Sequence, residues 1–113
     1  MAKDPDTPQI IVQQLIEALN RQDIDAVMRA LAGNCVIAAY GGATETVGAP
    51  AVRNIVLDLF EERPKARVNV MGRMALGAFV IQHESVARAL ETERRIAIYT
   101  VHNDKVSRIE FIR

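Results

Sequence analysis

The sequence predicts a single α+β domain in which a curved, mostly antiparallel sheet wraps around three N-terminal helices. Up to residue 63, apolar residues recur mainly at helical spacing, interrupted by one short strand-like run. From residue 65 onward they alternate or cluster as in strands, and turn signals separate the runs. Consecutive strands joined by hairpins favour antiparallel pairing over a doubly wound parallel sheet. This order of elements suggests a cone with an internal pocket.

Helices are expected over residues 8–21, 24–32 and 50–63. Thr7 and Asp23 stand before the first two, where a side-chain oxygen caps the first turn. Glycine follows the second helix and proline the third, and either residue ends a helix. Each segment carries an apolar stripe, so each is expected to bury one face against the sheet.

The other regular segments are expected to be strands. Asn103 and Asp104 form a tight-turn signal between the last two strands. The stretches 41–48 and 87–93 are expected to be connections, because glycine opens the first and the second is largely polar. The expected strands are residues 35–40, 65–74, 79–86, 94–102 and 106–112.

Residues 1–7 are expected to form a flexible tail and residues 8–113 a single domain, since 113 residues suffice for one core. The first residues are polar and lack the apolar centre of a signal peptide. No apolar run approaches the roughly 20 residues that span a membrane. The expectation is therefore a cytoplasmic protein with no membrane partner.

The composition argues against several functional classes. Lys plus Arg and Asp plus Glu both number 14, and this balance is unlike the basic surplus of nucleic-acid-binding proteins. Aromatic residues make up 4% and Trp is absent, which also disfavours stacking on nucleic-acid bases. Cys35 is the only cysteine, so neither an internal disulfide nor a Cys/His zinc site is expected. We expect no metal, no cofactor and no nucleic-acid partner.

Three segments carry a resemblance to a known family, namely residues 15–26, 77–86 and 98–109. In order and spacing they resemble the nuclear transport factor 2-like superfamily, which shares the cystatin-like cone, and in particular its SnoaL-like and ketosteroid isomerase-like bacterial members. The resemblance implies a strongly curved sheet with three helices across its concave side and an apolar pocket that takes a hydrophobic small molecule. It also implies a homodimer formed through the outer face of the sheet.

The chain departs from both of these mechanisms at the residues that matter. The tyrosine and two acidic residues typical of ketosteroid isomerases fall at Leu15, Ala39 and Ala97, and none of these side chains can transfer a proton. SnoaL-like cyclases use a pocket aspartate, whereas residues 79–101 contain no Asp. No catalytic residue is therefore carried over from either family.

Residues 77–86 supply the main ionisable candidate. Alternation along the strand places Phe79, Ile81 and His83 on one face, which the resemblance turns toward the pocket. His83 is either a general acid or base, because histidine titrates near neutral pH, or a packing residue hydrogen-bonded to a neighbour. Phe79 and Ile81 would line the pocket.

Glu84 follows His83 but points to the opposite face of a regular strand, so the two cannot form a catalytic pair. We expect Glu84 on the outer face, paired across strands or across a dimer interface with residues such as Arg94 or Arg108.

Tyr99 is the expected partner of His83, because odd-numbered residues of two hairpin strands can share the inner face. Its hydroxyl either donates to a substrate oxygen or belongs to a core aromatic at the pocket rim. Arg95 has the same phase and would bind a carboxylate or phosphate, unless it extends into water at the strand end. Tyr40 and Met71 complete the candidate ligand contacts.

Three functions fit these residues. The first is an isomerase- or cyclase-type enzyme that acts by proton transfer on a small hydrophobic carbonyl compound, with His83 and Tyr99 as catalytic candidates. The second is a non-catalytic binder of a hydrophobic small molecule. The third is an interaction module that dimerises through an outer face built from Val80, Ile96 and Ile98. Fold alone cannot choose among them, because one scaffold hosts many functions.

Overall fold

The computed structural model describes residues 6–42, 45–87 and 90–113, which form three helices and one six-stranded sheet. The helices are α1 (Thr7–Arg21), α2 (Ile24–Ala30) and α3 (Ala49–Glu62). The strands are β1 (Leu31–Ala39), β2 (Glu45–Val47), β3 (Arg67–Leu76), β4 (Phe79–Ala87), β5 (Thr92–His102) and β6 (Lys105–Ile112).

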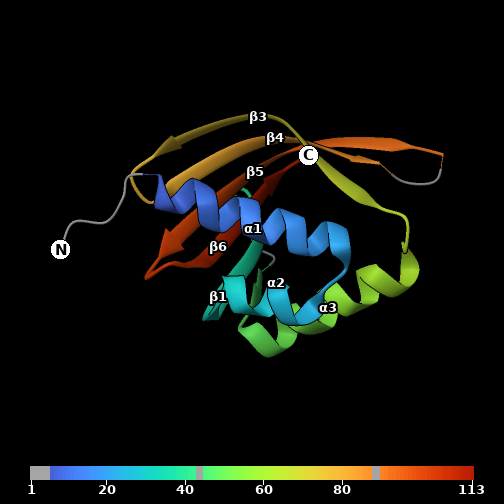
Figure 1. Ribbon diagram of the computed structural model, residues 1–113, viewed down its shortest axis with the longest axis horizontal. Coiled ribbons are helices and arrows are strands. Elements are labelled where there is room, and N and C mark those ends of the chain that lie inside the picture. Colours follow the sequence, from blue (N-terminus) through green and yellow to red (C-terminus); the bar gives the residue numbers. More distant parts are fainter. Residues whose placement is uncertain (1–5, 43–44, 88–89) are drawn as a thin grey trace.

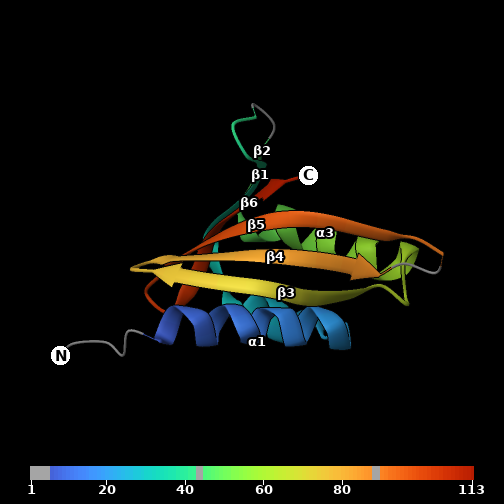
Figure 2. The same cartoon turned by 90° about the horizontal axis from the view of Figure 1, so that it is seen from above.

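The sheet has the strand order β2-β1-β6-β5-β4-β3 and is mostly antiparallel, with β1 and β6 as its parallel pair. It curves over the helices, as Figure 1 shows, with α1 below β3 and β4 and with α2 and α3 near β1. Figure 2 shows the outer face of β3, β4 and β5, with α1 running along the β3 side. The predicted α+β fold with a wrapped sheet is confirmed.

The core lies between the concave face of the sheet and the apolar stripes of the helices. Burial of these stripes is the main favourable contribution to folding. The core side chains include Val12, Leu15, Ile16, Val27, Val52 and Val56 from the helices, and Val80, Ala97, Tyr99, Val101, Val106 and Ile109 from the strands.

The ends of the first two helices differ in part from expectation. Asp23 caps α2 as predicted, because its Oδ1 accepts a hydrogen bond of 3.1 Å from the backbone N–H of Ala26. The prediction for Thr7 is wrong, since Thr7 is the first residue of α1, and Asp6 occupies the N-cap position, where its side chain makes no capping hydrogen bond. The end of α2 was also misplaced, because the chain enters β1 at Leu31, before Gly33.

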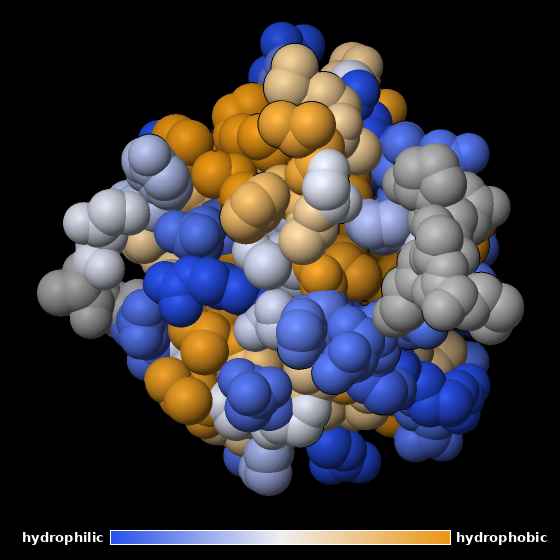
Figure 3. All heavy atoms as spheres, turned by 90° about the vertical axis from the view of Figure 1, so that its left-hand side faces the viewer, coloured by the Kyte–Doolittle hydropathy of each residue, from blue (hydrophilic) through white to orange (hydrophobic). Residues whose placement is uncertain are grey.

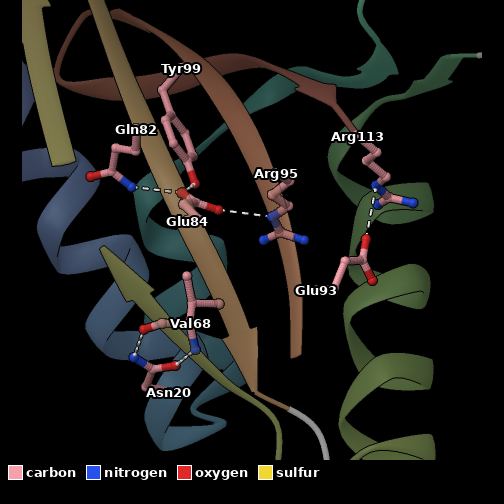
Figure 4. A network of polar contacts seen from close by, with 8 residues as sticks. All are labelled: Asn20, Val68, Gln82, Glu84, Glu93, Arg95, Tyr99 and Arg113. Atoms are coloured by element: carbon pink, nitrogen blue, oxygen red, sulfur yellow. Dashed lines mark hydrogen bonds and ion pairs between the residues drawn. The ribbon is translucent and has the colours of Figure 1, made fainter. Parts of the chain in front are cut away.

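The end of α1 is fixed to the sheet by one side chain. The Asn20 amide donates to the carbonyl of Val68 at 2.9 Å and accepts from the backbone N–H of Val68 at 2.8 Å (Figure 4). A side-chain amide that pairs with both backbone groups of an edge-strand residue replaces a missing ladder partner. Asn20 therefore sets where α1 crosses β3.

The predicted turn at Asn103 and Asp104 is confirmed, with φ angles of 50° and 62°. Two consecutive positive φ angles are typical of the tight turn that matches strand twist. The three-residue strand β2 lies within the region expected to be a loop, and it pairs with β1. Residues 1–5 of the expected tail lie outside the described residues. In the described parts, none of the helices is long and apolar enough to cross a membrane.

Candidate functional site

A row of polar side chains crosses the concave face of the sheet, where apolar residues would be expected. The register pairs Gln82 of β4 with Arg73 of β3, and Glu84 of β4 with Arg95 of β5. Val80 belongs to the same face of β4 and lies in the core opposite Tyr99. Because residues two apart on a strand share a face, Gln82 and Glu84 also point toward the helices.

The carboxylate of Glu84 is the centre of this row (Figure 4). Its Oε2 accepts hydrogen bonds from the Tyr99 hydroxyl and, at 2.7 Å, from the amide of Gln82. Its Oε1 accepts a charged hydrogen bond of 2.9 Å from Nε of Arg95. Glu84 is 0% exposed, so these three donors replace the water that a carboxylate would otherwise require.

Tyr99 acts in this network as a hydrogen-bond donor. Burial of its hydroxyl raises the pKa of Tyr99 well above its usual value, and the negative charge of Glu84 raises it further. The hydroxyl therefore stays protonated at neutral pH and keeps its proton directed at Glu84. A catalytic role for Tyr99 would thus be that of a neutral donor.

Arg95 links the buried carboxylate to the surface. Its guanidinium carbon lies 4.4 Å from the ring centroid of Phe111, while Nε is committed to Glu84. The side chain is 15% exposed, and its two Nη groups make no hydrogen bond to any described residue. Arg95 is therefore a fixed cation whose terminal donors remain available.

Arg73 and Gln13 extend the row to α1. Nε of Arg73 donates to Oε1 of Gln82 at 2.7 Å, and Nη2 donates to Oε1 of Gln13 at 2.5 Å. Since the Gln82 oxygen faces Arg73, its NH₂ group must face Glu84. Arg73 thereby fixes the orientation of the Gln82 amide.

The structure corrects the predicted orientation of β4 by one residue. His83 lies opposite Ile96 and Ile81 opposite Ile98, on the outer face, and Phe79 on that face is 51% exposed. The physical reason is the β4–β5 register, which places the even residues of β4 beside the inward-facing odd residues of β5. His83, Ile81 and Phe79 therefore do not meet Tyr99.

The same register overturns the expectation that Glu84 lies on the outer face beside Arg94 or Arg108. Its partner is Arg95, and Arg108 instead contacts Glu45 at 2.8 Å. Val80, expected to build the outer face, is fully buried in the core.

The remaining candidates lie apart from the row. Tyr99 and Arg95 face inward as predicted. Met71 lies at a bulge between Val70 and Gly72 and is largely exposed. Tyr40 is 61% exposed, and its backbone N–H donates a hydrogen bond of 2.9 Å to the carbonyl of Phe111.

Gln82 was not among the predicted site residues, and Glu84 was assigned to the wrong face. A usable signal was present, because Gln82 and Glu84 are two residues apart and Arg95 can face the same side from the next strand. Polar residues at i and i+2 that find donors on a neighbouring strand can be buried together.

A separate groove of about 250 Å³ lies between α1, α2 and the β5–β6 turn. None of the predicted site residues lines it. Its lining residues are Ile11, Gln14, Glu17, Arg21, Ala26, Arg29, Ala30 and Asp104. Among the residues that the structure describes, no three His, Cys, Asp or Glu side chains gather in a way that could hold a metal ion.

A family model for the SnoaL-like domain matches residues 12–109. The chain belongs to this family. The matched residues include the whole polar row. Phe111 and Arg113, which lie beside the row, fall outside the match. A search of curated proteins finds no match.

Solved structures share the fold of this SnoaL-like domain. An uncharacterised cystatin-fold protein from Novosphingobium aromaticivorans has a TM-score of 0.88 at 25% identity, covering 94% of this chain and 97% of that one. A Kribbella flavida protein, provisionally assigned as a ketosteroid isomerase, has a TM-score of 0.84 at 15% identity, covering 96% and 78%. An epoxide hydrolase from M. tuberculosis has a TM-score of 0.78 at 16% identity, covering 96% and 84%. The fold thus serves several activities and selects none of them for this chain.

Proposed function

We propose that this SnoaL-like domain binds a small, largely apolar molecule on its concave side and that Arg95 contacts an oxygen of that molecule. The observation that carries the proposal is the state of the Arg95 guanidinium. It is held by Glu84 through Nε and by Phe111 through its flat face, while both Nη groups lack a partner among the described residues. The side chain is 15% exposed, so a ligand oxygen could reach these donors and replace the water that would otherwise bind them.

The rest of the row supports this role by restricting the movement of Arg95. Tyr99 and Gln82 hold the Glu84 carboxylate, and Glu84 in turn holds Arg95. A side chain already locked in its binding rotamer loses little entropy when a ligand arrives. The network therefore preorganises a single cation, which explains why a costly buried charge is present in the concave interior.

A proton-transfer enzyme of the isomerase or cyclase type is the second candidate. The observation that favours it is the direct hydrogen bond between a carboxylate and a tyrosine hydroxyl on the concave side of the sheet. Arg95 would polarise the carbonyl oxygen of the substrate, and Glu84 would accept the proton. Glu84 is fully covered in this structure, so catalysis would require the carboxylate to be uncovered when substrate binds. Simple binding needs no such step and is the better supported function.

The test uses a panel of apolar compounds of graded size, each prepared as a carboxylate, a methyl ketone and a primary amide. Thermal unfolding is followed for the wild type, for Arg95→Met and for Arg94→Met, a matched control on the adjacent exposed residue. We expect at least one compound to raise the Tm of the wild type and of Arg94→Met but not that of Arg95→Met. The proposal is wrong if no compound raises the Tm, or if Arg95→Met responds like the wild type.

Chemical analysis of the bound compound then separates the two candidates. If the compound is recovered unaltered after incubation, the protein is a binder. If it isomerises or cyclises, and Glu84→Gln abolishes the conversion, the enzymatic candidate replaces it.

We also propose that two copies associate through the outer face of the sheet. Met74, Leu76 and Phe79 lie on this face and are 67%, 83% and 51% exposed. Figure 3 views the end of the sheet at the β3–β4 turn and shows hydrophobic side chains gathered toward the top, where the sheet lies. An exposed apolar patch of this kind suits a self-complementary contact with a second copy.

Sedimentation velocity at micromolar concentration tests this assembly. We expect a dimer for the wild type and a monomer for Phe79→Asp. Leu90→Asp is the control, because Leu90 is exposed but lies outside the strands, and it should remain dimeric. A monomeric wild type would exclude the dimer.

A further inference from the structure

We infer that the ligand of this site is an acid whose oxyanion is held jointly by Arg95 and Arg113. The inference rests on the proposed binding function and names the chemical class of the ligand. Its basis is a second guanidinium beside the same aromatic ring, together with the unused donors of both arginines.

Phe111 brings the two guanidiniums together. The guanidinium carbon of Arg95 lies 4.4 Å from the ring centroid, and that of Arg113 lies 5.5 Å from it. Both distances fall within the range of a cation–π interaction. The β5–β6 register leads to the same arrangement, because the pair Ile96 and Ile112 places Arg95 and Arg113 next to each other on neighbouring strands.

Most of the donors on these two arginines are not used by the described residues. A guanidinium carries five N–H donors. Arg95 uses only Nε, toward Glu84. Arg113 makes an ion pair with Glu93 in which Nε and Oε1 are 3.6 Å apart, too long for a hydrogen bond. The Arg113 side chain is 61% exposed and that of Arg95 15%, so an oxyanion could reach the remaining donors by replacing water.

The charges in the row point to an anion as the acceptor. The row contains the guanidiniums of Arg73 and Arg95 and the carboxylate of Glu84, and Arg113 adds a third guanidinium beside Arg95. Arg73 is hydrogen-bonded to two neutral amides, so its charge is not matched within the row.

The shape of the donors favours a carboxylate or a similar oxyanion over a ketone or an amide. A guanidinium presents two parallel N–H groups that match the two oxygens of a carboxylate. A ketone offers one oxygen and no charge. A primary amide also brings N–H donors, which would face the donors of the arginines. An apolar acid therefore uses the whole site, with Phe111 beside its charged end.

Isothermal titration calorimetry with the three compound series tests the inference. We expect the carboxylate to bind the wild type at least about tenfold more tightly than the ketone or amide of equal size, since charged hydrogen bonds carry this preference. Arg113→Met should weaken carboxylate binding several-fold and leave ketone binding unchanged. Arg94→Met should bind all three series like the wild type.

The outcomes separate this inference from the proposed function. Equal affinity for acid and ketone, with both lost in Arg95→Met, overturns the inference and leaves the proposed function standing. An unchanged affinity of Arg113→Met for the acid also overturns it. Absence of binding in every series overturns both. Arg95→Met leaves Glu84 without its cation, so the double variant Glu84→Gln/Arg95→Met is measured as well, and it should show no preference for the acid.

Discussion

The Tyr99 hydroxyl is the cleanest place to test the polar row, because Tyr99→Phe removes one oxygen atom and keeps the ring in the core. The lost hydrogen bond is donated to a fully buried carboxylate, and such bonds contribute about 1.5–3 kcal/mol. With a urea m-value of about 2 kcal/mol/M, a loss of about 2 kcal/mol lowers the unfolding midpoint by about 1 M. Equilibrium urea unfolding at neutral pH measures this shift directly.

Tyr40→Phe is the matched control, because it removes the same atom from a side chain that is 61% exposed. Its free energy of unfolding should stay within about 0.5 kcal/mol of the wild type. If Tyr99→Phe is as stable as Tyr40→Phe, the hydrogen bond from Tyr99 to the buried Glu84 carboxylate does not stabilise the fold, contrary to this prediction.

Alkaline pH gives an independent measurement of the same group. The pKa of Tyr99 is raised well above its usual value in the folded state, chiefly by burial, whereas the unfolded chain releases this proton near pH 10. Above about pH 10 the folded state therefore holds one more proton than the unfolded state, and stability falls by about 1.4 kcal/mol per pH unit. Tyr99→Phe lacks this contribution, so its difference from the wild type should narrow as pH rises. A constant difference would contradict the raised pKa.

Two further substitutions and one labelling reaction have defined outcomes. Glu84→Gln should lower the free energy of unfolding in urea by about 3–5 kcal/mol, because Arg95 loses its buried partner. The control Glu45→Gln removes a charge from an exposed ion pair and should cost about 1 kcal/mol or less. Similar losses in the two variants would contradict the prediction that burial makes the Glu84–Arg95 pair the more important one. His83→Ala should leave the ligand-induced rise in Tm unchanged, since His83 lies on the outer face. If this variant no longer shows the rise in Tm, His83 does contribute to the site. Burial raises the pKa of the Cys35 thiol, so native protein at pH 8 should react slowly with a disulfide reagent, and fast labelling without unfolding would refute this.

The helices and the last two strands were predictable because their signals are local. Asp23 caps α2 through a contact three residues away, and Asn103 and Asp104 set the β5–β6 turn by their own backbone preference. The inward phase of β5 was likewise predicted, so Tyr99 and Arg95 were assigned to the correct face. In each case the interaction that decides the structure lies within a few residues of the pattern.

The phase of β4 was not predictable from β4 alone. Residues 79–81 are all apolar, so alternation offers no contrast at the start of the strand. Gln82 and Glu84 then appear to belong outside, yet they are buried because Arg73, Tyr99 and Arg95 on other strands supply their partners. β4 extends to Ala87 and β5 begins at Thr92, so the connection between them is shorter than expected. The resulting β4–β5 register is not specified by the sequence of the turn.

The parallel pairing of β1 with β6 has a consequence for how the chain assembles. Ile37 pairs with Ile109, so β1 is made early in synthesis but acquires this neighbour only after nearly all the described chain has followed. Closing such a distant contact costs chain entropy before any bond rewards it, and domains rich in distant contacts fold slowly. Because β6 also joins β5, its arrival connects the β1–β2 hairpin to the β3–β4–β5 meander in one step. Folding of this domain should therefore be limited by the docking of β6, which leaves both halves of the sheet exposed to solvent until it occurs.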